Sequence, residues 1–196
     1  MIVMIIEITG TPGTGKSSVT KIVAKKLDAR LIDIKKIVDE KRIYKKSNGE
    51  KEVDVKKLQK VIDNEIKIAS TLKPLAPSII IEGHLACELK IPADYLFVLR
   101  CRPDILEKRL KKRKYSQKKT DENLLAEMLD YCLQRAETNK KTFKERVNIV
   151  EIETANRSIN QVVTIMLAVI NKRKKKVDKV NYSKYLTEYT RKFHGR

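Results

Sequence analysis

Short apolar runs recur along the chain and predict the strands of a buried sheet. Residues 2–8, 78–81 and 95–99 are mostly aliphatic runs, and two shorter candidates occupy residues 31–32 and 148–152. Apolar runs of this length are typical of strands that are covered on both faces. The pattern therefore predicts five strands of a parallel sheet.

Between these runs, apolar residues recur at steps of three and four, which is the spacing of one helix face. The predicted helices cover residues 17–27, 58–69, 105–111, 123–143 and 159–170. Strands that alternate with helices are joined by right-handed crossovers, which place helices on both faces of a parallel sheet. The expected fold class is therefore α/β, with one domain at residues 1–171.

A glycine-rich loop stands between the first predicted strand and the first predicted helix. It reads Gly10-Thr11-Pro12-Gly13-Thr14-Gly15-Lys16-Ser17. Glycines let backbone N–H groups curl around an anion, and the following helix directs its positive end at that anion. In a loop of this spacing, Lys16 reaches the β- and γ-phosphates and Ser17 offers its hydroxyl to Mg²⁺. The sequence therefore predicts an enzyme that binds Mg-ATP through a P-loop.

Two polar residues follow the third predicted strand. Glu82 ends that strand and His84 comes two residues later. Since α/β proteins bind ligands at the carboxyl ends of their strands, Glu82 is expected to hold the water shell of Mg²⁺ beside Ser17. His84 could orient a water or contact a phosphate, and a surface histidine explains its position equally well.

Residues 100–119 are strongly basic. Arg109 and Arg113 are four residues apart and therefore share one helix face. Guanidinium groups suit the recognition of phosphates in transfer. The run predicts a lid over the phosphates, and a solvated basic helix is the alternative.

Composition adds a preference for partners that carry phosphate. The chain has 44 Lys and Arg against 25 Asp and Glu, a formal net charge of +19. Such a surface attracts nucleotides or RNA, although it can also serve solubility alone. The three cysteines, Cys87, Cys101 and Cys132, are widely spaced and predict a reducing, cytoplasmic location without disulfides. No apolar run approaches the length of a membrane span.

Several motifs together resemble one known family. They are residues 9–18, Ile81-Glu82-Gly83-His84-Leu85, residues 98–103, and the stretch from Glu107 to Ser116. These segments are similar to the archaeal form of adenylate kinase isoenzyme 6, also called the coilin-interacting nuclear ATPase family. The resemblance covers roughly residues 4–170.

The resemblance implies an adenylate-kinase-like fold with an arm that binds the nucleoside monophosphate and a short lid. The arm falls at about residues 33–56, where Asn48-Gly49 predicts a turn, and the lid at about residues 112–122. The family usually has glycine where this chain has Lys114, a departure that bears on the turn of the lid.

The resemblance also implies the site residues. The ATP contacts it implies are Gly13, Thr14, Gly15, Lys16, Ser17, Ser18, Arg113 and Arg157, with Asn156 also near adenine. The implied catalytic residues are Lys16, Arg113, Glu82 and His84, and the implied Mg²⁺ contacts are Ser17 and, through water, Glu82.

The activity that the resemblance implies is a broad-specificity nucleoside monophosphate kinase, which converts ATP and AMP into two ADP. It further implies ATPase activity and a role in late maturation of the small ribosomal subunit. Its partners there would be a platform protein of that subunit, bound transiently, and rRNA. The residues alone leave two alternatives open: an ATPase switch for ribosome assembly, and a P-loop kinase of a non-nucleotide metabolite.

Residues 172–196 form a basic extension that begins with Lys172-Arg173-Lys174-Lys175-Lys176. Its apolar residues, which fall on one face of a predicted helix, are Tyr182, Tyr185, Leu186, Tyr189 and Phe193. Such a face either packs back on the domain or docks a ribosomal component. We expect packing for the aromatic face and docking for the basic segment.

Overall fold

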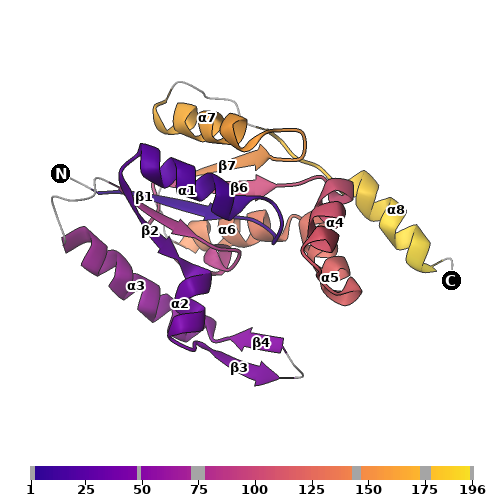
Figure 1. Cartoon of the computed structure of the whole chain (residues 1–196), viewed down its shortest axis with the longest axis horizontal. Coiled ribbons are helices and arrows are strands. Elements are labelled where there is room, and N and C mark those ends of the chain that lie inside the picture. Colours follow the sequence, from indigo (N-terminus) through magenta and orange to yellow (C-terminus); the bar gives the residue numbers. More distant parts are fainter. Residues whose placement is uncertain (1–2, 48–49, 72–77, 143–146, 173–177, 195–196) are drawn as a thin grey trace.

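The core is a five-stranded parallel sheet with helices on both faces (Figure 1). The computed structural model describes residues 3–47, 50–71, 78–142, 147–172 and 178–194. The strands, in spatial order, are β2 (Ala29–Asp33), β5 (Ser78–Glu82), β1 (Met4–Thr9), β6 (Tyr95–Arg100) and β7 (Asn148–Glu153). All four pairings are parallel. The predicted α/β class and its five strands are confirmed.

Side chains of the central strands alternate between the two faces of the sheet. Ile6 and Ile8 of β1 pack with α1 (Lys16–Lys26) and α7 (Ile159–Ile170). The opposite face packs against α3 (Val55–Thr71), the 3-10 turn η1 (Ala86–Glu88) and α6 (Tyr131–Thr142). Since both faces are covered, the strands read as continuous apolar runs.

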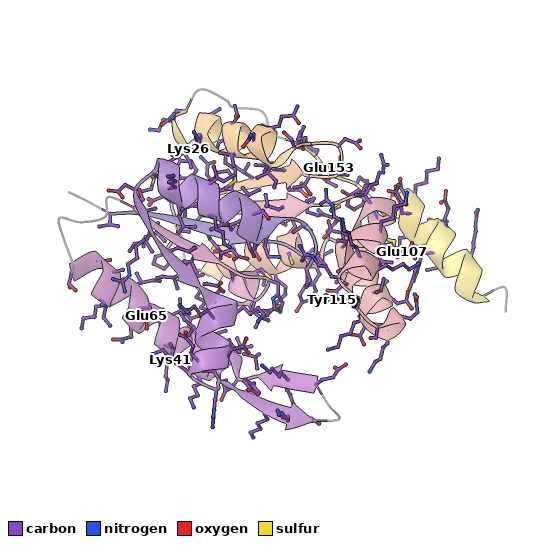
Figure 2. The ribbon with its side chains drawn as sticks, viewed as in Figure 1. Lys26, Lys41, Glu65, Glu107, Tyr115 and Glu153 are labelled. Carbon is purple, nitrogen blue, oxygen red and sulfur yellow. The ribbon has the colours of Figure 1, made fainter. Side chains whose placement is uncertain are left out.

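The arm between β2 and α3 is a short helix and a hairpin. The helix is α2 (Ile34–Glu40), and β3 (Tyr44–Ser47) pairs antiparallel with β4 (Glu50–Val53). The predicted turn at residues 48–49 lies outside the described residues. Lys41 directly follows α2, and its Nζ forms an ion pair at 3.5 Å with the Glu65 carboxylate of α3 (Figure 2). This ion pair connects the arm to the core.

The predicted lid, at about residues 112–122, spans the turn between α4 (Pro103–Lys112) and α5 (Gln117–Met128). Lys114, in the turn between them, has φ +58°, the left-handed conformation that favours glycine. The turn therefore forms with a lysine in this conformation, at a cost of about 1–2 kcal/mol.

The prediction of one continuous helix over residues 123–143 is wrong. The chain breaks at Leu129 and Asp130, so that α5 and α6 are separate helices. Asp130 has φ +54°, and its carboxylate is paired with the Arg100 guanidinium. A tertiary ion pair fixes this break, which local periodicity does not reveal.

The basic extension ends in α8 (Ser183–His194), which lies beside α4 and α5 (Figure 1). Val180, Tyr185, Leu186 and Tyr189 pack around the buried Tyr182 and the apolar side chains of α4 and α5. This is the arrangement that the packing alternative describes. Residues 173–177, most of the basic segment, lie outside the described part of the chain.

Glu7 is a buried carboxyl group in the middle of β1. It is 2% exposed, and its Oε1 has no hydrogen-bond partner among the described residues. Burial raises the pKa of Glu7 well above its usual value, and nearby Cys132 adds to the rise. The folded protein therefore binds a proton more tightly here than the unfolded chain does.

We expect Glu7→Gln to change how stability depends on pH. With wild-type Glu7, stability is fully present below the pKa of the unfolded chain and declines as the pH rises toward the folded pKa, by about 1.4 kcal/mol for each pH unit that separates the two. The melting temperature of the variant, relative to wild type, should therefore rise between pH 4.5 and pH 8. The exposed Glu52→Gln is the control. A relative melting temperature that does not vary with pH would contradict a raised pKa.

Candidate active site

The glycine-rich loop connects β1 to α1 at the carboxyl edge of the sheet. Gly10 has φ +139°, and a Cβ there would lie 2.3 Å from the Leu99 carbonyl oxygen. The Thr14 amide and hydroxyl both donate to the Thr11 carbonyl, at 3.3 and 2.9 Å. Gly15, at φ +98°, then starts α1. The loop thus forms a tight turn, and the N-terminus of the helix that follows it points to where an anion would bind.

Lys16 is the cation of the loop. Its side chain is buried, and Nζ donates to the carbonyl oxygens of Gly10 at 2.7 Å and Thr11 at 3.1 Å. Burial lowers the pKa of Lys16, and the nearby Glu82 carboxylate opposes that shift. These contacts hold a desolvated ammonium group inside the turn, where its attraction for a phosphate is stronger than in water.

Glu82 lies beside the start of α1. Its carboxylate accepts a hydrogen bond from the Ser17 hydroxyl at 3.4 Å. Burial raises the pKa of Glu82, while Lys16 lowers it. Gly83 allows this packing, because a Cβ there would lie 2.8 Å from the Ile34 Cβ.

Ser17 and Glu82 fit a magnesium site. A hydroxyl and a carboxylate are hard oxygen ligands of the kind Mg²⁺ prefers, and Mg²⁺ usually completes its shell with phosphate oxygens and water. In the described part of the chain, no three His, Cys, Asp or Glu residues cluster as a metal cage. The pair could thus serve Mg²⁺ together with a bound triphosphate.

His84 is exposed and lines the same cavity as Glu82. Desolvation by surrounding protein atoms lowers the pKa of His84 to about 4, and the positive charges of Lys16 and Lys35 add to the decrease. The imidazole is therefore neutral at pH 7, so it can accept a hydrogen bond from a water or donate one to a phosphate.

Two cavities meet at the loop. The first, about 500 Å³, lies between the loop, α4 and α7, and its apolar wall is Val19, Ile159 and Val162. The second, about 430 Å³, lies between the loop, the end of β5 and the arm. The residues that line both cavities are Gly13, Gly15, Ser18 and Arg113. The loop is therefore shared by two compartments, each large enough for a small ligand.

Arg113 and Arg109 play different parts. Arg109 donates to Thr154 through both terminal nitrogens, at 3.1 and 2.9 Å, and contacts the Gly13 carbonyl at 3.5 Å. Thr154 in turn donates toward the Thr14 carbonyl at 2.9 Å. The Arg113 side chain is exposed and has no hydrogen-bond partner among the described residues. Arg109 thus braces the loop, whereas Arg113 is available to a ligand.

Arg157 and Asn156 follow β7. Arg157 lines the first cavity and is paired with Asp178. Asn156 is exposed and does not line either cavity. The structure therefore brings Arg157 to the loop but not the Asn156 side chain.

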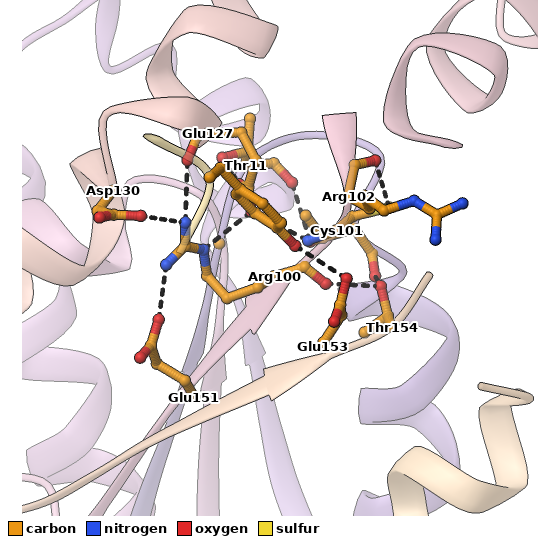
Figure 3. A network of polar contacts seen from close by, with 12 residues as sticks. Thr11, Arg100, Cys101, Arg102, Glu127, Asp130, Glu151, Glu153 and Thr154 are labelled. Atoms are coloured by element: carbon orange, nitrogen blue, oxygen red, sulfur yellow. Dashed lines mark hydrogen bonds and ion pairs between the residues drawn. The ribbon is translucent and has the colours of Figure 1, made fainter. Parts of the chain in front are cut away.

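A buried ionic network supports the loop from behind (Figure 3). The Thr11 hydroxyl donates to Glu127 Oε2 at 2.5 Å, and Glu127 Oε1 accepts from Arg100 Nε at 2.9 Å. Arg100, 1% exposed, also pairs with Asp130 and Glu151. Including Arg100 in the phosphate-covering run was wrong, because its guanidinium points into the protein.

Sequence reasoning also missed the cations of the second cavity. Lys35 and Lys51 both pair with Asp39, at 2.9 and 2.5 Å, and Lys119 of α5 lines the same cavity. The hydrogen bond from Lys51, followed by the one from Lys35, lowers the pKa of the Asp39 carboxyl group to about 2. The sequence does contain a polar, lysine-rich stretch at residues 33–54, but that stretch does not indicate which of its lysines line a cavity.

No helix in the described ranges combines the length and apolar character that a membrane span requires.

Known proteins resemble this chain over most of its length. The family model described as "AAA domain" matches residues 6–130. A Methanocaldococcus jannaschii protein named "Putative adenylate kinase" is 33% identical over 189 residues, 95% of this chain and 97% of that protein. An Archaeoglobus fulgidus protein of the same name is 38% identical, covering 85% and 82%.

Among solved structures, shikimate kinase from Acinetobacter baumannii in complex with shikimate has a TM-score of 0.60 at 17% identity. The alignment covers 89% of this chain and 96% of that one, and it shows a shared P-loop kinase fold. With a P-loop, a carboxylate facing its serine, and archaeal relatives matched over most of their length, the chain belongs to the AAA-domain family and to the family of these archaeal proteins named for adenylate kinase.

Proposed function

We propose that this protein is a nucleoside monophosphate kinase that transfers the γ-phosphoryl group of Mg-ATP to AMP and related monophosphates. The observation that carries the proposal is the pair of cavities that share the loop and Arg113. A hydrolase needs one nucleotide compartment and a water, whereas a transferase needs two compartments that meet at the reacting phosphate. The names of the archaeal relatives support the same reaction.

The first cavity suits the donor. Its aliphatic wall can cover one face of a base, and Arg157 can cover the other. The loop then receives the triphosphate, and Mg²⁺, held by Ser17 and by Glu82 through water, would neutralise phosphate charge.

The second cavity suits the acceptor. Lys35, Lys51 and Lys119 supply positive charge for a monophosphate, and Asp39 holds the first two in place. The arm contributes Lys35 and Lys51 to this cavity, which links acceptor choice to residues 33–53. In the transfer, an acceptor phosphate oxygen bonds to the γ-phosphorus while the bridging oxygen leaves with ADP. Lys16 and Arg113 stabilise the charge that develops between them.

We expect Arg113→Ala to lower turnover about 10- to 1,000-fold while changing ATP affinity less than about tenfold. The guanidinium lies between the two compartments, so its contact should strengthen as the phosphoryl group moves. ADP formation from ATP and AMP, together with equilibrium binding of ATP, measures both effects. Lys108→Ala, an exposed change on the same helix, is the control. Equal losses in affinity and turnover would argue against a role in the transition state.

The reaction itself is tested with the wild-type protein. ATP plus AMP should give two ADP, and ADP release should be slow when no monophosphate is present. Turnover with a non-nucleotide acceptor and not with any monophosphate would support the metabolite kinase instead. Phosphate release that is indifferent to AMP would support an ATPase.

A second candidate is an ATPase role in maturation of the small ribosomal subunit, with a subunit protein and rRNA as transient partners. Two observations favour it: the net charge of +19, and the neutral His84, which lines the same cavity as Glu82 and could orient a water. The test is phosphate release from ATP with and without small-subunit RNA and protein. Stimulation that His84→Ala removes, with ADP formation from AMP retained, would support this role.

A further inference from the structure

The C-terminal extension reaches the wall of the first cavity through Asp178. The Asp178 carboxylate pairs with both terminal nitrogens of Arg157, and the second of these contacts is 3.0 Å. Asp178 Oδ2 also accepts from the backbone amide of Glu153, at the end of β7, at 2.9 Å. One carboxylate therefore joins the extension, the last strand and a cavity residue.

Arg157 is held from two directions. Besides Asp178, its Nη1 donates to the Glu153 carbonyl at 3.0 Å. The hydrogen bonds to Asp178 raise the pKa of Arg157, and both side chains are partly buried, with 29% and 25% exposed. A bidentate pair of this kind fixes the plane of the guanidinium as well as its position.

The segment that carries Asp178 is itself anchored in the domain. Tyr182, 4% exposed, lies with its ring 5.2 Å from the Arg100 guanidinium carbon and donates its hydroxyl to Glu153 at 3.2 Å. Val180 and Tyr185 pack with the apolar side chains of α4 and α5 around it. The position of Asp178 is therefore set by the buried ionic network and the lid helices.

We propose that Asp178 is a positioning residue for the donor nucleotide, which presents the flat face of Arg157 to the base. The proposal rests on the donor site of the proposed function. In this arrangement the extension contributes to the donor site, because it holds Arg157, which lines the first cavity together with Ile159 and Val162 of α7. The group that Arg157 contacts is the nucleobase of a nucleoside triphosphate, whereas the loop binds the phosphates.

The division of labour between base and phosphates gives a sharp test. ATP and inorganic tripolyphosphate both occupy the loop, but only ATP carries a base. We expect Asp178→Asn to weaken ATP binding about 3- to 30-fold, the range of a stacked guanidinium, and to leave tripolyphosphate binding within about twofold. Glu188→Gln in α8 is the matched acidic control, and melting curves verify that each variant is folded.

A double-variant cycle distinguishes positioning from a general loss of structure. If Asp178 acts through Arg157, then Asp178→Asn should add little to Arg157→Ala in ATP binding. Asp178→Glu, which keeps the charge, should recover part of the affinity. Equal weakening of ATP and tripolyphosphate, additive losses in the double variant, or unchanged ATP binding would each overturn the proposal.

These binding measurements do not depend on the acceptor reaction. If the wild-type protein binds ATP but forms no ADP from any monophosphate, the proposed kinase activity fails while the base-specific effect of Asp178 can still be observed. If ADP forms normally and the binding pattern is absent, only the role of Asp178 is lost.

Discussion

Replacing Lys16 with alanine is expected to reduce ADP formation from ATP and AMP by about 10³-fold or more, and to reduce ATP hydrolysis to a similar degree. Lys16 is the only lysine or arginine of the loop sequence, and it is desolvated. Phosphoryl transfer depends mainly on positioning and on stabilising developing charge, so the loss of this ammonium group removes several kcal/mol, about 4 or more, of stabilisation.

The fold should survive this change. Among the described residues, the Lys16 side chain donates to two carbonyl oxygens of the loop, which water can reach once the side chain is gone. Melting temperature and turnover are therefore measured side by side, with Lys25→Ala, an exposed change on the same helix, as the control. Lys16→Met keeps the aliphatic stem and separates the charge from the packing. Activity within about tenfold of wild type would contradict the assigned role.

The phosphate loop could be predicted because its chemistry is local. Its glycines, Lys16 and Ser17 are consecutive in the chain, and the strand and helix on either side leave clear hydrophobic patterns. Glu82 was also predictable, because the end of a buried parallel strand is a position where ligands bind. The structure places its carboxylate 3.4 Å from the Ser17 hydroxyl.

The supporting contacts of the site could not be predicted, because they join residues that are distant in the sequence. Arg100 and Arg113 both lie in a basic run, and composition cannot tell which of them faces a ligand. Arg100 is the last residue of a buried strand, and its guanidinium forms ion pairs with carboxylates from α5, β7 and the turn between α5 and α6. Asp178 was hidden for the same reason, since its partner Arg157 is 21 residues away.

The break between α5 and α6 shows how tertiary pairing can override a helical pattern. Apolar spacing continues through residues 123–143, so periodicity alone favours one helix. The structure instead places Asp130 in the left-handed conformation, where its carboxylate reaches Arg100. The strain of one such residue is about 1–2 kcal/mol, which a partly buried hydrogen bond between charged groups can offset.

Arg100→Met is expected to have the largest effect on stability. Arg100 neutralises Glu127, which is 2% exposed, together with Asp130 and Glu151. Removing one partner of a buried ionic cluster leaves uncompensated charge, which costs about 3–5 kcal/mol. For a domain of this size the melting temperature should fall by roughly 10 °C. The matched control is Arg102→Met, whose pair with Asp104 is only partly buried and should affect stability much less.

A double variant identifies the cause of that loss. If the cost comes from buried carboxylates without a cation, then Arg100→Met with Glu127→Met should be more stable than Arg100→Met alone, because the most buried charge is gone. The single variant should also recover part of its stability at pH 4, where protonation removes the uncompensated charge. Since Glu127 accepts the Thr11 hydroxyl, both variants should bind ATP more weakly than wild type even under conditions where they are fully folded. A double variant no more stable than the single one would indicate that Arg100 contributes through packing against Tyr182 rather than through its charge.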